Sequence, residues 1–175
     1  NQFAYLESLM RDAGINPRSL SCRHSSRIDE RINQALEALK VTDHLNQHFA
    51  SQASKLMEVE MEIGDRIQYY IDAMGLKSDE ELIHKTDNPL GLTTRGNNTL
   101  DRLLELEQTE NNTTGGMAGT AWQSFNTVTE YLDHAWVYDR KGVEVNQKRV
   151  ESALLGTGMR TKDRAWREAV ARIVA

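Results

Sequence analysis

The chain has 175 residues, a net charge of −5, and 39% hydrophobic against 27% charged residues. This length allows one domain with a sizeable core, and the acidic balance argues against electrostatic wrapping of nucleic acid by the whole surface. No segment approaches the roughly 20 apolar residues that cross a bilayer, and residues 1–13 lack the basic start and apolar run of a secretory signal. The single cysteine, Cys22, excludes an internal disulfide and fits a reducing compartment. We therefore expect a cytoplasmic protein that does not enter membranes.

The sequence predicts an all-α fold, a helical bundle, compact or elongated, that forms a single domain over residues 1–175 around one long central helix. Strong helix formers fill the chain, and only Pro17 and Pro89 interrupt them. Apolar residues recur at helical spacing between capping and turn residues. The predicted helices cover residues 2–13, 26–40, 43–74, 78–85, 97–109, 120–138, 146–155 and 160–174.

The longest predicted helix, over residues 43–74, has an apolar residue at every seventh position. The four residues are Phe49, Leu56, Ile63 and Tyr70. This spacing predicts a seam for another helix, either inside the bundle or in a coiled coil with a second chain. A turn near residue 41 and a continuous helix through Val41 are both compatible with the pattern.

Two shorter features complete the predicted elements. Ser78 and Glu81 have the spacing of a capping box, which predicts that Ser78 caps the helix over residues 78–85. Residues 111–119 are polar and contain three glycines, so we predict a mobile loop there.

Two stretches resemble a known family of proteins. Residues 94–100 read Thr-Arg-Gly-Asn-Asn-Thr-Leu, and residues 119–122 read Gly-Thr-Ala-Trp. The second stretch leads into residues 126–134, which read Asn-Thr-Val-Thr-Glu-Tyr-Leu-Asp-His. These strings are similar to the signature of a phage- and plasmid-associated family known as domain of unknown function 932, over roughly residues 23–170.

The resemblance implies a setting and a fold rather than a reaction. It implies the helical C-terminal part of a phage or plasmid protein, because family members usually have an additional N-terminal part with β-structure. The chain begins with Asn1 rather than Met, so we expect a fragment or a processed chain. Residues 1–20 do not resemble the family's N-terminal part, so we also expect that part to be absent.

The helix over residues 120–138 carries the candidate polar face. Asn126, Glu130 and His134 are spaced at i, i+4 and i+8, so they lie on one side of this helix, and the family string also includes Trp122 and Asp133. A carboxylate and an imidazole one turn apart can pair, contact a partner, or supply two ligands to a metal ion. We favour structural pairing, because a metal site needs three or more protein ligands. His44 and His48 have the same spacing and the same limitation.

Cations cluster at helix starts and near the C-terminus, where they could contact DNA or another anion, pair with acidic residues of the same chain, or be solvated. Residues 141–175 hold eight basic and four acidic residues, a local charge of +4 on an otherwise acidic chain. Helix starts attract anions through their free N–H groups. The candidate contacts are Arg23, His24, Arg95, Lys148, Arg149, Arg160, Lys162, Arg164 and Arg167. Trp166 between two arginines indicates either an aromatic–cation surface or an anchor for the last helix.

These patterns favour binding over catalysis, and we expect no cofactor. The first hypothesis is a helical module that supports recombination or replication of a mobile element, with DNA as a candidate partner. The second is a protein–protein module of phage assembly or of a host-directed factor, in which the seven-residue seam pairs with a protein partner or a second copy. The third is a metal-assisted enzyme that uses Glu130 and His134.

Overall fold

The structure, a computed structural model, describes residues 14, 28–85, 88–135 and 156–173. Its elements are α2 (Ile28–Glu58), α3 (Ile63–Met74), α4 (Glu80–Lys85), α5 (Thr94–Glu107), α6 (Glu110–Thr113), η3 (Thr114–Gly116), α7 (Ala121–Glu130), η4 (Tyr131–Ala135) and α9 (Thr157–Ala171). The described residues form helices and two isolated β-bridges but no strand, which confirms the all-α fold. The helices predicted over residues 2–13 and 146–155 lie outside the described residues.

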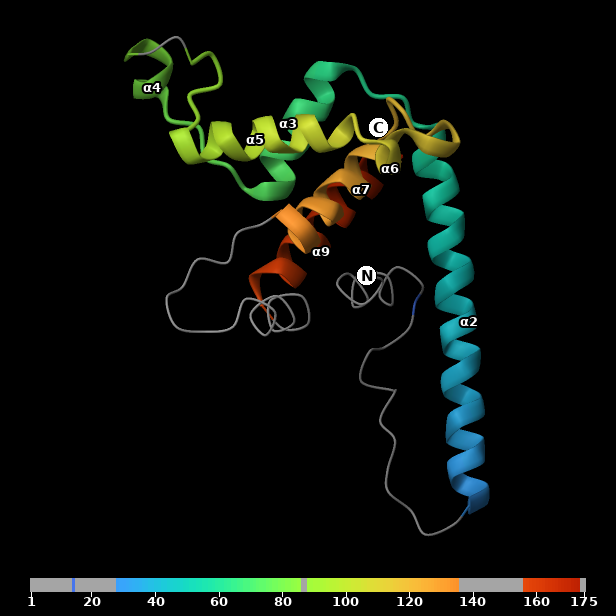
Figure 1. Cartoon of the computed structure of the whole chain (residues 1–175). Helices are drawn as coiled ribbons and strands as arrows, with labels where there is room; N and C mark the ends of the chain where they lie inside the picture. Colours follow the sequence, from blue (N-terminus) through green and yellow to red (C-terminus); the bar gives the residue numbers. More distant parts are fainter. Residues whose placement is uncertain (1–13, 15–27, 86–87, 136–155, 174–175) are drawn as a thin grey trace.

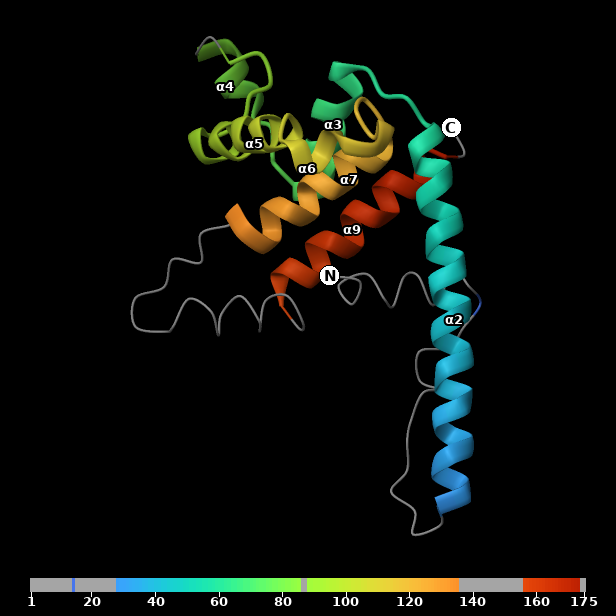
Figure 2. The ribbon, with the colours of Figure 1, turned by 45° about the vertical axis from the view of Figure 1, so that its right-hand side comes forward.

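The long helix α2 stands along one side of a body formed by the other helices (Figures 1 and 2). Only the C-terminal half of α2 meets this body, and its N-terminal half extends past it in both views. In the body, α9 packs against both α3 and α7, and α5 packs against α7. None of the helices in the described ranges has the length and apolar character needed to cross a bilayer.

The predicted helix over residues 43–74 is wrong in its boundaries. The helix runs without interruption from Ile28 through Val41 to Glu58, the chain then breaks, and α3 begins at Ile63. The break is held by backbone hydrogen bonds to residues 119–121, because the Met61 N–H donates to the Gly119 carbonyl at 2.8 Å and the Ala121 N–H donates to the Val59 carbonyl at 2.9 Å. The seven-residue seam therefore does not continue past Leu56.

The core is organised around aromatic rings from three helices. Trp166 of α9 stacks on Phe49 of α2 at 5.4 Å between ring centroids and meets Phe125 of α7 edge-on at 5.2 Å. Trp166 is fully buried. Of the two interpretations of this tryptophan, the anchor of the last helix is the one that the structure supports.

Three local predictions are corrected by the structure. The helix predicted to start at residue 97 starts at Thr94, because Thr93 caps it by accepting the Gly96 N–H at 3.2 Å. Helix α4 begins at Glu80 rather than at residue 78, and the Ser78 hydroxyl donates to the Leu90 carbonyl at 2.7 Å. The last helix begins at Thr157 rather than at residue 160.

The predicted loop over residues 111–119 contains local structure. Helix α6 and the 3-10 turn η3 occupy most of it, and Asn112 is only 2% exposed. The Asn112 amide donates to the Leu106 carbonyl at 2.9 Å, which ties this segment to the end of α5. The predicted mobility of the segment stays a prediction.

Candidate functional site

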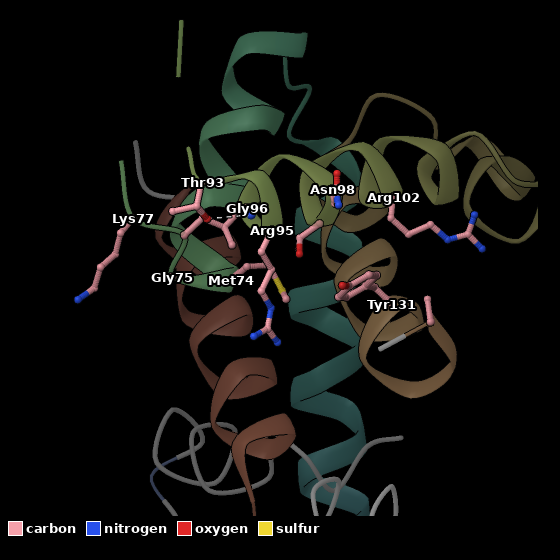
Figure 3. Close-up of a pocket in the computed structure, with 12 residues that line it drawn as sticks. Met74, Gly75, Lys77, Thr93, Arg95, Gly96, Asn98, Arg102 and Tyr131 are labelled. Carbon is pink, nitrogen blue, oxygen red and sulfur yellow. Dashed lines mark hydrogen bonds between the residues drawn. The ribbon is translucent and has the colours of Figure 1, made fainter. Parts of the chain in front are cut away.

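A groove with a volume of about 640 Å³ lies between the end of α3, the first half of α5 and the turn η4 (Figure 3). Its size is within the range of pockets that hold small ligands or parts of larger ones. The residues that line it are Met74, Gly75, Leu76, Lys77, Thr93, Arg95, Gly96, Asn98, Thr99, Arg102, Tyr131 and Ala135.

Helix α5 supplies one wall of the groove as a regular polar face. Arg95, Asn98, Thr99 and Arg102 follow one another at i, i+3, i+4 and i+7, so their side chains lie on one side of the helix. The Thr93 cap places Arg95 in the first turn, where backbone N–H groups also favour anions.

The opposite end of the groove is shaped by the C-terminus of α3. Gly75 ends this helix with a left-handed φ of 64°, which glycine adopts without strain. A Cβ atom at this position would lie 2.8 Å from the Arg164 guanidinium, and the Arg164 Nε donates to the Ala73 carbonyl at 2.8 Å. Arg164 therefore closes the end of α3 directly behind the groove wall.

The groove is electropositive although the chain is acidic. Its twelve lining residues include three cations, Lys77, Arg95 and Arg102, and no carboxylate. Lys77 and Arg95 are exposed and form no ion pair within the part of the chain that the structure describes. Arg102 pairs with Glu105 at 2.7 Å, but both side chains are more than half exposed, and such pairs hold weakly. The groove therefore presents donors and positive charge to an anion.

The π-helical turn η4 separates the groove from a second, smaller pocket. Tyr131 and Ala135 line the groove, whereas Asp133 and His134 line the second pocket, which has a volume of about 340 Å³. The residues that line this second pocket are all polar: Asn111, Asn112, Asn126, Thr129, Glu130, Asp133 and His134.

The structure brings most of the predicted polar face together in this second pocket. Glu130 accepts a hydrogen bond from the buried Asn112 amide at 2.5 Å, and the Asn126 amide donates to the Met117 sulfur at 3.5 Å. Trp122 is the exception. It lies on the other side of α7, where it packs against Phe49 with ring centroids 5.7 Å apart.

Comparison with protein families matches residues 12–155 to the family described as Domain of unknown function (DUF932). The match covers well over half of the 175 residues. The chain belongs to the DUF932 family. No curated protein and no solved structure was found to match it.

The two DUF932 strings identified in the sequence occupy the two pockets. Residues 94–100 contribute Arg95, Gly96, Asn98 and Thr99 to the groove. Residues 126–134 contribute their polar side chains to the second pocket and Tyr131 to the groove. The turn η4 is thus the point at which both strings meet.

The metal-centre hypothesis for this DUF932 chain depends on a third ligand close to Glu130 and His134. In the described segments, no three residues among histidine, cysteine, aspartate and glutamate are placed to hold one ion. The Glu130 carboxylate is engaged with Asn112, and Asp133 with Lys162 at 2.5 Å. The pair His44 and His48 likewise gains no third ligand among the residues described.

Of the cationic residues predicted to contact DNA, Arg95 lines the groove, and none of the others that the structure describes does so. The prediction that Lys162 contacts DNA is wrong. This side chain is only 1% exposed and its ammonium pairs with Asp133, so it cannot reach a surface ligand. Arg164 is engaged with α3, while Arg160 and Arg167 are exposed and Arg167 pairs with Asp163 at 3.1 Å. The other candidates lie outside the described residues: Arg23, His24, Lys148 and Arg149, together with Cys22.

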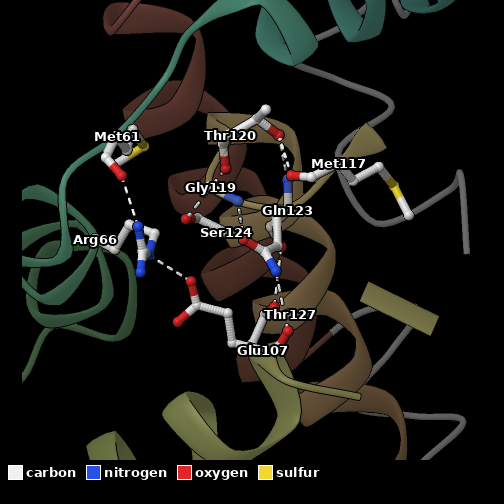
Figure 4. Close-up of polar contacts among 9 residues, drawn as sticks. All are labelled: Met61, Arg66, Glu107, Met117, Gly119, Thr120, Gln123, Ser124 and Thr127. Atoms are coloured by element: carbon white, nitrogen blue, oxygen red, sulfur yellow. Dashed lines mark hydrogen bonds and ion pairs between the residues drawn. The ribbon is translucent and has the colours of Figure 1, made fainter. Parts of the chain in front are cut away.

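A buried polar network joins α3, α5 and α7, and the sequence did not reveal it (Figure 4). Glu107, fully buried at the end of α5, forms an ion pair with Arg66 of α3, and its backbone carbonyl accepts from the Gln123 amide at 3.0 Å. Burial raises the pKa of Glu107, and Arg66 opposes this effect. The sequence feature that could have indicated this network is Arg66, a charged residue among the apolar residues of the predicted helix.

Among the groove residues that the sequence did not mark as contacts are Lys77, Arg102 and Tyr131. Arg102 could have been found, because it follows Arg95 by seven residues on the same helix face. Lys77 and Tyr131 come from other elements, so no spacing connects them to Arg95.

Proposed function

We propose that this DUF932 chain is a nucleic-acid-binding module that holds phosphate groups in its basic groove. It would support recombination or replication of a phage or plasmid in the bacterial cytoplasm, without catalysis of its own. The observation that carries the proposal is the composition of the groove, with three cations and no carboxylate among its twelve lining residues.

The donors of the groove suit phosphate. Arginine and lysine are the usual phosphate contacts, and amide and hydroxyl side chains such as Asn98 and Thr99 add neutral donors beside them. The α5 face from Arg95 to Arg102 extends about 10 Å at 1.5 Å per residue. Phosphates follow one strand of a duplex about every 3.4 Å along the helix axis, so this face can contact more than one.

The proposed contact surface for DNA differs from the one expected from the sequence. The sequence placed it on the C-terminal cations, but Lys162 and Arg164 are engaged inside the protein. The groove lies instead on α3, α5 and η4, and Arg95 is the one sequence candidate that lines it.

Charge reversal in the groove tests the proposal against a matched control. We expect the chain to bind a fluorescein-labelled oligonucleotide, as measured by fluorescence anisotropy, with an affinity that falls steeply between about 50 and 200 mM salt. The double variant K77E/R95E should bind about tenfold more weakly and with a shallower salt dependence, because it loses two phosphate contacts.

The variant K40E/K55E is the control, because it makes the same charge change on α2 away from the groove. It should retain most of the affinity. Equal losses in the two variants would show that overall charge alone decides binding. No salt-dependent binding by the native chain would remove the proposal.

A protein–protein module remains a second candidate, and one observation favours it. Leu36 and Leu39, on the half of α2 that extends past the body, are 49% and 60% exposed. Leu36 and Leu39 are neighbours at i and i+3 on this helix, and contiguous exposed apolar patches mark interaction sites. The partner would be a second copy or another helical protein, and the oligomeric state in solution is the test.

A further inference from the structure

The turn η4 is held to α9 by a buried ion pair. Lys162 donates to the Asp133 carboxylate at 2.5 Å, with the lysine side chain 1% exposed and the aspartate side chain 22% exposed. Asp133 is two residues from Tyr131, which lines the groove, and both belong to the same π-helical turn. The pair therefore lies directly behind a groove wall.

Lys162 occupies a position where an apolar residue would be expected. It belongs to the buried side of α9 together with Ala165, Trp166 and Ala169. Placing an ammonium group there costs desolvation, and a buried ion pair is often replaced by apolar residues without loss of stability. A stabilising role alone therefore gives a weak account of this lysine.

The π-helical geometry of η4 is a second unusual feature at the same place. Hydrogen bonds from i to i+5 are rare in proteins and are frequent at functional sites. In this chain the π-helical turn sends Tyr131 and Ala135 toward the groove and Asp133 toward Lys162.

We propose that the Asp133–Lys162 ion pair positions Tyr131 in the groove and so sets the affinity of the groove for its phosphate-bearing ligand. The inference rests on the proposed function of the groove. Lys162 acts as a positioning residue, because its ammonium is buried behind the wall and does not touch the ligand. Tyr131 contacts the ligand, and the ion pair fixes the turn that carries it.

The variant Lys162→Met tests this role. Methionine fills a similar volume, but it leaves the Asp133 carboxylate without its partner, so we expect a folded variant with a lower melting temperature, and binding is measured well below that temperature. Binding of the labelled oligonucleotide should weaken about fivefold or more, in the range of coupling between adjacent groups. Asp133→Asn breaks the same pair from the other side and should give the same loss of affinity. The double variant D133N/K162M removes both charges, so it tests the loss of the pair without leaving an unpaired charge in the protein interior.

The salt dependence separates positioning from direct contact. Removing a cation that touches phosphate lowers the salt slope by about one, whereas removing a buried cation leaves the slope unchanged. Arg160→Met is the matched control, because it removes one positive charge from the exposed side of the same helix. The inference predicts that Lys162→Met weakens binding more than Arg160→Met does, with an unchanged slope.

A double-mutant cycle identifies Tyr131 as the residue through which the pair acts. In a Tyr131→Ala background, Lys162→Met should cause no additional loss of affinity, while Tyr131→Phe, which keeps the ring, should retain the effect of Lys162→Met. Independent losses at the two positions would overturn the inference, as would a Lys162→Met variant that is folded and binds like the native chain.

Failure of the inference is distinguishable from failure of the proposed function. If K77E/R95E weakens binding but Lys162→Met does not, the groove is the binding site and the positioning role is wrong. If K77E/R95E binds like the native chain, the groove is not the site, and both proposals fail.

Discussion

Glu107 is a carboxylate at the centre of the body, where α3, α5 and α7 meet. Its partner Arg66 is 16% exposed, and the backbone of Glu107 is tied to Gln123. Taking a carboxylate out of water disfavours its charged form, and here this effect exceeds the attraction of Arg66, so the pKa of Glu107 is raised above 4.5. The network joins three helices, so we expect the stability of the fold to depend on pH.

The direction of this pH dependence follows from the raised pKa. The folded state binds the Glu107 proton more tightly than the unfolded chain does, so this contribution to stability is complete below about pH 4.5 and is lost as pH rises through the folded-state pKa. Glu107→Gln removes the titration. Above about pH 4.5, we expect the free energy of unfolding of the native chain to fall relative to that of the variant, as measured by urea unfolding at several pH values.

The comparison uses the slopes against pH rather than the absolute stabilities. Glu107→Gln leaves Arg66 without its carboxylate, and breaking a buried pair from one side is destabilising by itself. Parallel curves for the two proteins between pH 4 and pH 7, within about 0.3 kcal/mol, would contradict the raised pKa.

At the scale of elements, helix type was predictable and helix boundaries were not. Apolar periodicity correctly indicated helix over Ile28–Glu58 and Ile63–Met74, because packing of one face stabilises an amphipathic segment wherever it lies in the fold. The break between α2 and α3 depends instead on two backbone hydrogen bonds, from Met61 to Gly119 and from Ala121 to Val59, whose partners are far apart in the sequence. Local spacing carries no information about such a partner.

Gly119 holds this break through its backbone conformation, which gives the next prediction. Its φ is 77°, and a Cβ at this position would meet open space, so the cost of Gly119→Ala is conformational alone. We expect a destabilisation of about 1–2 kcal/mol in urea unfolding.

Gly64 is the control, since it is helical in α3 and a Cβ there also meets open space. Gly64→Ala should stabilise by about 0.5 kcal/mol, because alanine has the higher helix propensity. Effects of the same sign in both variants would contradict the role given to Gly119.

At the scale of the whole molecule, the site combines elements that the sequence could not bring together. Arg95 was a candidate from its place at a helix start, but Lys77 and Tyr131 become its neighbours only when α3, α5 and η4 pack. Lys162 shows the reverse case. Its charge suggested exposure, and the face of α9 that packs into the body determined its burial. Charge patterns therefore indicate which residues can bind an anion, and only packing shows which of them can reach one.

The extended half of α2 gives a prediction about assembly. A helix of 31 residues is about 46 Å long, and among the described residues the core meets α2 at Val41, Leu45, Phe49 and Leu56. If the exposed Leu36 and Leu39 pair with the same surface of a second copy, light scattering should give twice the 19.9 kDa mass of one chain.

L36E/L39E should restore the mass of a single chain without loss of helix, because glutamate and leucine have similar helix propensities. The control is M57E/I63E, which places two glutamates at exposed apolar positions, 37% and 52% exposed, at the other end of α2 and on α3. It should leave the assembly intact. A native chain that stays monomeric at every concentration would exclude this surface as a self-association site, and dissociation by both variants would point to a general effect of charge.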